Sequence, residues 1–379
     1  MQRFAATAVA IASFASGQLL VQPKKMLHRT HDPLTSEPDP ELRRQLALEG
    51  FPTFMGVAEA DENQQNDVLA PMHWHIVPKT GVVLLNPLVP FEYIYRHQHK
   101  QHKAVEGGYM DKSPQLICGA RGRACARRAH PRDRRWSRYL AAKLLFSEAV
   151  KYWTIVDPNP VTTFAIPNLK IVRGYVEDLD KLPLEVDCVV HSHTLEHMYD
   201  PARFFEIVRH FLKPGQLHIF SVPNLFALVA EGKPSLHFEH TILLREEHIN
   251  WLLVNKGFEI VTMRHFGGKH SIFYVTRAVE QLLPKTVSPN FYAENRRVFQ
   301  LWQDRLFEDV SFFKRRLAED KKRNFIFAAH VATQYLLAVG LPAAKFAGVS
   351  VQINSGLGLL KNDFSNLCAC SLLCKCGPT

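Results

Sequence analysis

One segment of the chain joins a strand signal, a polar loop and a helix start: Asp187-Cys188-Val189-Val190-His191-Ser192-His193-Thr194-Leu195-Glu196-His197-Met198-Tyr199-Asp200-Pro201. Its first part, Cys188-Val189-Val190, is a short β-rich run, and an amphipathic helical pattern extends from Pro201 to Leu212. The polar residues between them therefore follow the end of a strand. In an open α/β sheet, ligands bind at that place.

Similar β-rich runs lie on both sides of this segment and alternate with helical patterns. The runs are Trp153–Val156, Lys170–Val172, Leu217–Phe220, Phe258–Val261 and Ser271–Val275. A second amphipathic pattern, Arg245 to Lys256, is closed by Gly257, which is typical of a helix end. This alternation predicts an α/β fold with a mostly parallel sheet and helices on both faces.

The composition excludes several other classes of protein. The chain has 379 residues, of which 46% are hydrophobic and 22% charged, so it is neither disordered nor collagen-like. Seven cysteines are too few and too unevenly spread for a disulfide scaffold. The net charge of +10 is concentrated in residues 121–138, where eight arginines accompany one acid, Asp133. With only Trp136 and Tyr139 for base stacking, this run favours a solvated segment over a nucleic-acid site.

The termini carry separate signals. Residues 1–22 begin with Met1-Gln2-Arg3 and the apolar run 4–15, the layout of a signal or organelle transit peptide, with an ordinary cytoplasmic N-terminus as the alternative. That run is shorter than the roughly 20 apolar residues of a membrane span. In the best later candidate, 326–341, His330 and Gln334 interrupt the apolar pattern. We therefore expect no transmembrane segment, and the compartment stays open.

The rest of the chain divides into three expected parts. Residues 23–110 hold a loosely structured lead-in, up to about residue 66, and a small hairpin module built on 74–77 and 82–85. Residues 111–280 form the main α/β domain. Residues 290–379 form a second, smaller α/β unit, in which a long charged helical stretch precedes a strand and an apolar helix. A truncated form of this unit is an open alternative.

Four motifs follow one another in the main domain: an acidic strand end at Asp157, Gly174-Tyr175-Val176-Glu177-Asp178-Leu179, Leu195-Glu196-His197 and Leu212-Lys213-Pro214-Gly215. In this order and spacing, over about residues 115–278, they resemble the class I S-adenosylmethionine-dependent methyltransferases. Phe238-Glu239-His240-Thr241 and the C-terminal strand–helix unit resemble the sugar C-methyltransferase branch. The resemblance implies a Rossmann-like methyltransferase sheet, with a small N-terminal hairpin module and a smaller, Rossmann-like C-terminal unit.

The resemblance also implies a cofactor, S-adenosylmethionine, and residues that bind it. Asp157 would accept hydrogen bonds from the ribose hydroxyls, Glu177 and Asp178 would lie near the adenine, and His193 would face the cofactor. Gly119 and Gly122 stand where the family has its glycine-rich turn, but 38 positions separate Gly119 from Asp157, against roughly 20 in comparable dinucleotide folds. This turn departs from the family pattern.

His240 is the predicted catalytic base, because histidine titrates near neutrality and this one lies in the acceptor-side motif. The expected reaction transfers a methyl group from S-adenosylmethionine to a small hydroxylated or sugar-like acceptor, with the oligomeric state open. Two alternatives remain. The chain could be a degenerate methyltransferase fold that only binds a partner, as the altered glycine turn indicates, or an RNA methyltransferase.

The sequence also contains candidate metal ligands. His193, Glu196, His197 and His240 have the ligand types for a divalent ion and are similar to a Glu-x-x-Glu-His motif of small-RNA 2′-O-methyltransferases. However, Leu-Glu-His is common at this loop in metal-free relatives. The four tail cysteines, in 368–376, do not have the usual zinc spacing. The prediction is therefore that no metal is bound.

Overall fold

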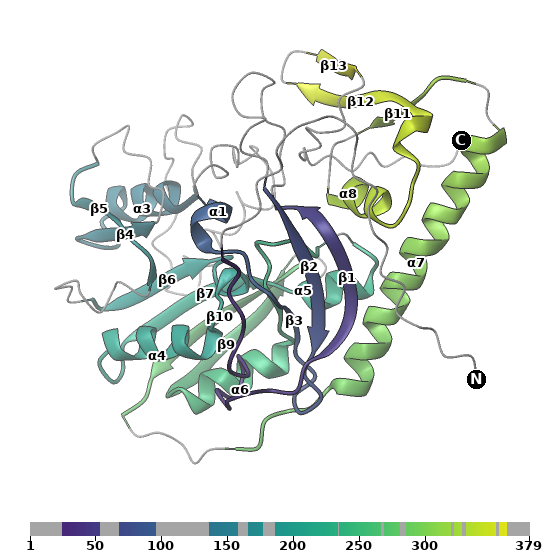
Figure 1. Ribbon diagram of the computed structural model, residues 1–379. Helices are drawn as coiled ribbons and strands as arrows, with labels where there is room; N and C mark the ends of the chain where they lie inside the picture. The colour runs from purple at the N-terminus through teal and green to yellow at the C-terminus, as the bar shows by residue number, and fades with distance from the viewer. Residues whose placement is uncertain are drawn as a thin grey trace.

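The structure is a computed structural model (Figure 1). It describes residues 25–53, 68–95, 136–157, 166–176, 186–233, 235–266, 269–280, 286–319, 322–327, 331–353 and 356–361. Several sequence predictions lie outside the described residues: the N-terminal segment 1–22, Gly119 and Gly122, the greater part of the arginine run 121–138, Glu177 and Asp178, and the tail cysteines.

The central sheet has the order β6-β7-β10-β9, formed by Cys188–Ser192, Leu217–Pro223, Ser271–Ala278 and Phe258–Phe266. β6 is parallel to β7, whereas β10 is antiparallel to both β7 and β9. The prediction of a mostly parallel sheet is therefore wrong at this edge. β9 and β10 follow each other with only residues 267–270 between them, too short a connection for a parallel crossover.

A second sheet contains β4 (Trp153–Asp157) and β5 (Leu169–Arg173), which are parallel. Helix α3 (Trp136–Phe146) connects this pair to the central sheet. Its Leu140 is buried against Ile219 and Phe273, and Trp153 of β4 packs on the same cluster. In Figure 1 the β4–β5 pair accordingly lies beside β6.

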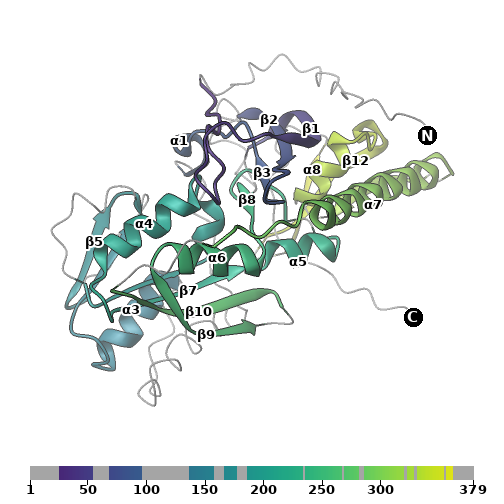
Figure 2. The same cartoon turned by 90° about the horizontal axis from the view of Figure 1, so that it is seen from below.

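Helices cover both faces of the central sheet, as predicted. α4 (Pro201–Phe211) and α6 (Glu246–Asn255) lie on the face opposite α3 (Figure 2). Their side chains Phe205 and Leu252 are buried in one hydrophobic core with Phe220 and Tyr274 of the sheet. α4 begins where its sequence indicates, because Pro201 occupies the first turn and the Asp200 carboxylate accepts a hydrogen bond from the Arg203 N–H at 2.9 Å.

The N-terminal residues form a third sheet, β1-β2-β3-β8. β2 (Leu69–Ile76) and β3 (Val83–Leu85) pair antiparallel. They do not form a separate module, because β8 (Ile242–Leu243), from the main domain, pairs with β3. The prediction of a loose lead-in is wrong at β1 (Arg43–Pro52), whose burial alternates along the strand. A short helix, α1 (Phe91–Tyr95), follows β3.

The C-terminal part contains α7 (Tyr292–Glu319), β11 (Asn324–Phe327), α8 (Val331–Ala338), η4 (Ala343–Lys345), β12 (Phe346–Ile353) and β13 (Gly356–Lys361). β11 is parallel to β12, and β13 is antiparallel to β12. One hydrophobic core contains residues of all three expected parts, such as Phe51, Phe238 and Trp302. The expected domain boundaries stay predictions, but the parts share a core.

Two short elements complete the fold near the strand ends, η3 (Leu195–His197) and α5 (Leu225–Ala230). No helix among the described residues is long and apolar enough to cross a membrane.

Candidate active site

Two of the residues predicted to bind the cofactor lie at strand ends. Asp157 is the last residue of β4, is half-buried, and is the register partner of Arg173 on β5. His193 follows the last residue of β6 and has a φ of 50°, which is uncommon for a residue other than glycine and occurs often at functional sites. The backbone thus places both residues at carboxyl ends of parallel strands.

His193 is held by two hydrogen bonds. Its backbone N–H donates to the Ser221 carbonyl at 2.9 Å, and its Nε2 lies 3.2 Å from the Ser271 hydroxyl oxygen. Burial lowers the pKa of His193 to about 4, with a smaller contribution from the neighbouring His270. The imidazole is therefore neutral at physiological pH.

Glu196 lies on η3, one turn after His193, and is 3% exposed. Its Oε1 lies 3.7 Å from His197 Nε2 and 3.9 Å from His193 Nδ1. Among the described residues, Oε2 has no hydrogen-bond partner. Burial raises the pKa of Glu196 to about 8, because few polar groups near it replace the water that a carboxylate loses.

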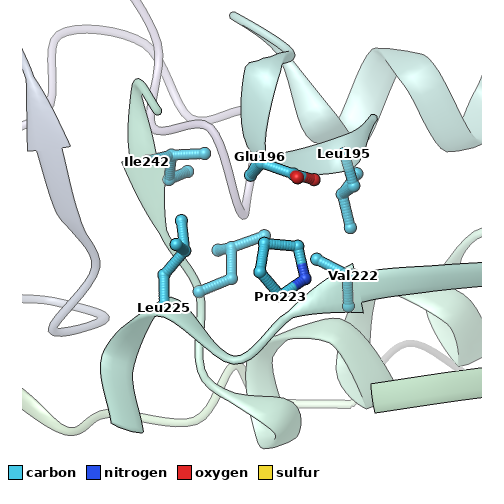
Figure 3. A pocket seen from close by; sticks show the side chains of 7 residues that line it. Leu195, Glu196, Val222, Pro223, Leu225 and Ile242 are labelled. Carbon is cyan, nitrogen blue, oxygen red and sulfur yellow. The ribbon is translucent and has the colours of Figure 1, made fainter. Parts of the chain in front are cut away.

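A narrow pocket lies beside this carboxylate (Figure 3). Leu195 and Glu196 form one side, and Val222 and Pro223 the other; Leu225, Ile242 and Leu244 complete the lining. The Glu196 carboxylate is therefore the acidic group of an otherwise apolar surface.

The predicted catalytic residue, His240, comes from the segment between α5 and β8. Its Nδ1 lies 3.0 Å from the Ser235 carbonyl, and its ring centroid is 5.3 Å from that of His197 and 3.7 Å from that of His237. Burial lowers the pKa of His240 to about 4. The neutral ring can accept a proton at pH 7, but it is a weaker base than the sequence prediction assumes.

The structure brings Glu196, His197 and His240 together, although over forty positions separate the first from the last. One ligand-type atom of each residue lies within 4.8 Å of those of the other two. The Thr241 N–H donates to the Glu196 carbonyl at 3.1 Å, and the Thr241 hydroxyl donates to the Met198 carbonyl at 3.1 Å. These bonds fix the His240 segment against η3.

Sequence reasoning missed a residue that supports this arrangement, Arg29. Its guanidinium donates to three backbone carbonyls, those of Leu85 and Thr241 at 3.1 Å each and that of Tyr199. Burial lowers the pKa of Arg29 to about 10, which leaves it charged. Arg29 lies in a stretch without periodicity, so no local pattern pointed to it.

One segment of the chain is similar to known methyltransferases. Residues 131–263 match a family model described as a methyltransferase domain. A relative named "Probable S-adenosylmethionine-dependent methyltransferase", from Mycolicibacterium smegmatis, is 30% identical over 94 residues, which are 25% of this chain and 37% of the relative. One of the same description from Mycobacterium tuberculosis is 27% identical over 97 residues, 26% of this chain and 35% of that protein.

Among solved structures, human N-acetylserotonin methyltransferase in complex with S-adenosylmethionine is 18% identical, with a TM-score of 0.30 over 37% of this chain and 44% of that one. The chain spans little more than a third of the curated relatives that it matches. The family model confirms the prediction of a methyltransferase domain over residues 131–263, and the names of the relatives agree with the predicted cofactor, S-adenosylmethionine. The sugar C-methyltransferase branch stays a prediction.

Proposed function

We propose that the protein transfers a methyl group from S-adenosylmethionine to a small hydroxylated, sugar-like acceptor. The observation that carries this proposal is the placement of Asp157 and His193 at carboxyl ends of parallel strands inside the segment that matches a methyltransferase domain. In open α/β sheets such ends form the ligand crevice.

The residues at these two strand ends suit the cofactor. Asp157 would hold the ribose through its carboxylate, and the neutral His193 ring would border the cofactor without repelling its sulfonium charge. We propose that Gly119 and Gly122 approach the methionine part and that Glu177 and Asp178 lie near the adenine. The bound cofactor supplies an electrophilic methyl group, so the protein mainly aligns donor and acceptor.

The acceptor side of the proposal rests on Glu196, His197 and His240. Of these, Glu196 lines a narrow and otherwise apolar pocket, and a ligand atom of each histidine lies within 4.8 Å of one of its carboxylate oxygens. A narrow apolar pocket with one polar group suits a small acceptor with a hydroxyl better than a polymer. Because Nδ1 of His240 donates its hydrogen to the Ser235 carbonyl, the lone pair of the ring lies on Nε2. We propose that this lone pair is the catalytic group on the acceptor side.

The first experiment measures S-adenosylmethionine binding by calorimetry and then incubates the full chain with the methyl-labelled cofactor and a fractionated metabolite extract. We expect binding at micromolar concentrations and label in one small, hydroxyl-bearing fraction. A folded chain that does not bind the cofactor would refute the proposal. Binding without labelling of any fraction would instead favour the degenerate, partner-binding alternative. Label in RNA, supplied in a parallel incubation, would favour the RNA methyltransferase alternative.

A further inference from the structure

We infer that Glu196, His197 and His240 form a binding site for a divalent transition-metal ion of the zinc type, which revises the sequence-based expectation of no metal. One ligand-type atom of each residue lies within 4.8 Å of the others. Two atoms bound to one tetrahedral zinc at about 2.1 Å lie roughly 3.4 Å apart, and His197 Nε2 is already 3.7 Å from Glu196 Oε1. Small side-chain rotations would therefore close the site.

The two imidazoles are held in the tautomer that a metal requires. Nδ1 of His197 lies 3.0 Å from the Glu239 carbonyl, and Nδ1 of His240 lies 3.0 Å from the Ser235 carbonyl. A carbonyl only accepts, so each Nδ1 carries the hydrogen and each Nε2 carries the lone pair. Metal-binding histidines almost always have such a partner on the other ring nitrogen, because it fixes both the tautomer and the orientation.

Glu196 is the second, independent observation. Its side chain is 3% exposed, and its Oε2 has no hydrogen-bond partner among the described residues. A carboxylate withdrawn from water is costly unless a cation or hydrogen-bond donors compensate it. A divalent ion between Glu196 and the two histidines would supply that compensation.

The donor set selects the kind of ion. Two imidazole nitrogens and one carboxylate oxygen suit Zn²⁺ and similar transition ions and leave a coordination position open. Mg²⁺ prefers oxygen ligands throughout. His193 is not part of this group. Its Nε2 lies 3.2 Å from the Ser271 hydroxyl oxygen, and this contact holds the ring.

The open position gives the ion a role that rests on the proposed function. A hydroxyl group of the acceptor that reached this position would have its pKa lowered by the cation, as happens to water on zinc. The ion would then take the place of a base. Metal binding itself can be measured with neither cofactor nor acceptor, so it can fail or hold separately from the methyltransferase proposal.

The test uses the full chain, carrying Ser in place of the four tail cysteines so that thiolates there do not bind the probe. After chelator treatment, Co²⁺ is titrated in and followed by its visible absorption, and Zn²⁺ is then used to displace it. We expect one Co²⁺ per chain, displaced by one Zn²⁺ and not by Mg²⁺. His197→Ala and His240→Ala should each weaken Co²⁺ binding at least about 100-fold, whereas the exposed His210→Ala on α4 should not change it.

Glu196→Gln keeps the shape of the side chain and covers the case in which an alanine variant does not fold. Zn²⁺ should raise the unfolding temperature of the wild type and of His210→Ala, but not that of Glu196→Gln. The inference is overturned if the wild type binds neither ion, if Glu196→Gln is stabilised by Zn²⁺ as strongly as the wild type, or if the folded histidine variants retain wild-type Co²⁺ affinity.

Discussion

The two sides of the candidate active site are built in different ways. On the cofactor side, Asp157 and His193 each lie at the end of a parallel strand, so backbone topology alone places them. On the acceptor side, Glu196 and His197 meet His240 through tertiary hydrogen bonds from Thr241 and through the Arg29 side chain. The cofactor side therefore depends on local sequence, and the acceptor side depends on how distant parts of the chain pack.

The electrostatic surroundings differ in the same way. Asp157 is half-buried. Glu196 is almost completely buried, and burial raises its pKa to about 8 while it lowers the pKa of His240 to about 4. Substitutions on the acceptor side should consequently have larger effects, because a group removed there leaves partners that water cannot reach.

The largest expected effect is that of His240→Ala. It should lower turnover by about 10²–10⁴-fold, the usual contribution of a positioned catalytic group. The affinity for S-adenosylmethionine should stay within about twofold, because His240 comes from a different segment than the strand ends that we propose hold the cofactor. Single-turnover kinetics and calorimetry on the same preparation measure the two quantities.

Chelator treatment decides what His240 contributes. If the metal inference is right, chelator abolishes the activity of the wild type and Zn²⁺ restores it. Chelator-resistant activity together with an inactive His240→Ala would return His240 to the role of a general base. A fully active His240→Ala would remove it from the reaction altogether.

The next largest effect is expected for Arg29, whose hydrogen bonds hold the acceptor side in place. Arg29→Ala should lower the free energy of unfolding by roughly 2–4 kcal/mol, because it removes charge-assisted hydrogen bonds and leaves the Leu85 and Thr241 carbonyls short of a donor. Urea unfolding measures this change in the free energy of unfolding. The control is Arg203→Ala, whose exposed pair with Glu206 should contribute less than about 1 kcal/mol. Equal losses in the two variants would show that Arg29 does not hold the acceptor side.

A smaller effect is expected on the cofactor side. Asp157→Ala should weaken S-adenosylmethionine binding by about 1.5–3 kcal/mol, the contribution of hydrogen bonds to a charged group. Asp309→Ala, on the exposed face of α7, is the matched control and should bind normally. If Asp157→Ala binds as tightly as the control, the carboxylate does not hold the ribose.

The same contrast explains what could be predicted from the sequence. Strands and helices of the main domain follow from periodicity, which is a local property. The positions of Asp157 and His193 at strand ends were predicted correctly, because each adjoins its strand. The start of α4 was also readable, from Asp200-Pro201. The antiparallel pairing of β9 and β10 was not predicted, because a β-rich run does not show whether its strand is parallel or antiparallel to its neighbour. The short connection between the two runs was a usable signal of an antiparallel hairpin.

Less of the acceptor side than of the cofactor side could be predicted from the sequence. The types of ligand were visible in the sequence, but their proximity depends on β8 joining the N-terminal sheet and on Arg29, in a stretch without a pattern. The carbonyl partners of His197 and His240 are backbone atoms, which no side-chain motif records. The prediction of no metal relied on how common Leu-Glu-His is. The metal inference relies on these carbonyl partners, which metal-binding histidines usually have.

The last expected effect depends on pH and concerns two histidines behind the site, His191 on β6 and His218 on β7, whose Nε2 atoms lie 3.0 Å apart. Burial lowers the pKa of His191 to about 3 and that of His218 well below its usual value. Both stay neutral in the folded chain at a pH at which the unfolded chain has bound protons. The free energy of unfolding should therefore fall as the pH drops below about 6.5, by up to about 1.4 kcal/mol per pH unit for each histidine.

Buried carboxylates oppose this trend and make a matched comparison necessary. Burial raises the pKa of Glu196 to about 8 and that of Glu239 to about 7, so their protonated forms stabilise the fold at low pH and lose that contribution as the pH rises toward 8. His218→Leu isolates one histidine, since it keeps both carboxylates and fits among Phe205, Phe220 and Phe258. Between pH 6.5 and 4.5, the free energy of unfolding of His218→Leu should depend less steeply on pH than that of the wild type, by up to about 1.4 kcal/mol per pH unit. Above pH 7 the two proteins should have the same slope. Urea titrations across that range measure both slopes, and parallel curves at every pH would mean that His218 titrates alike in the folded and unfolded chain.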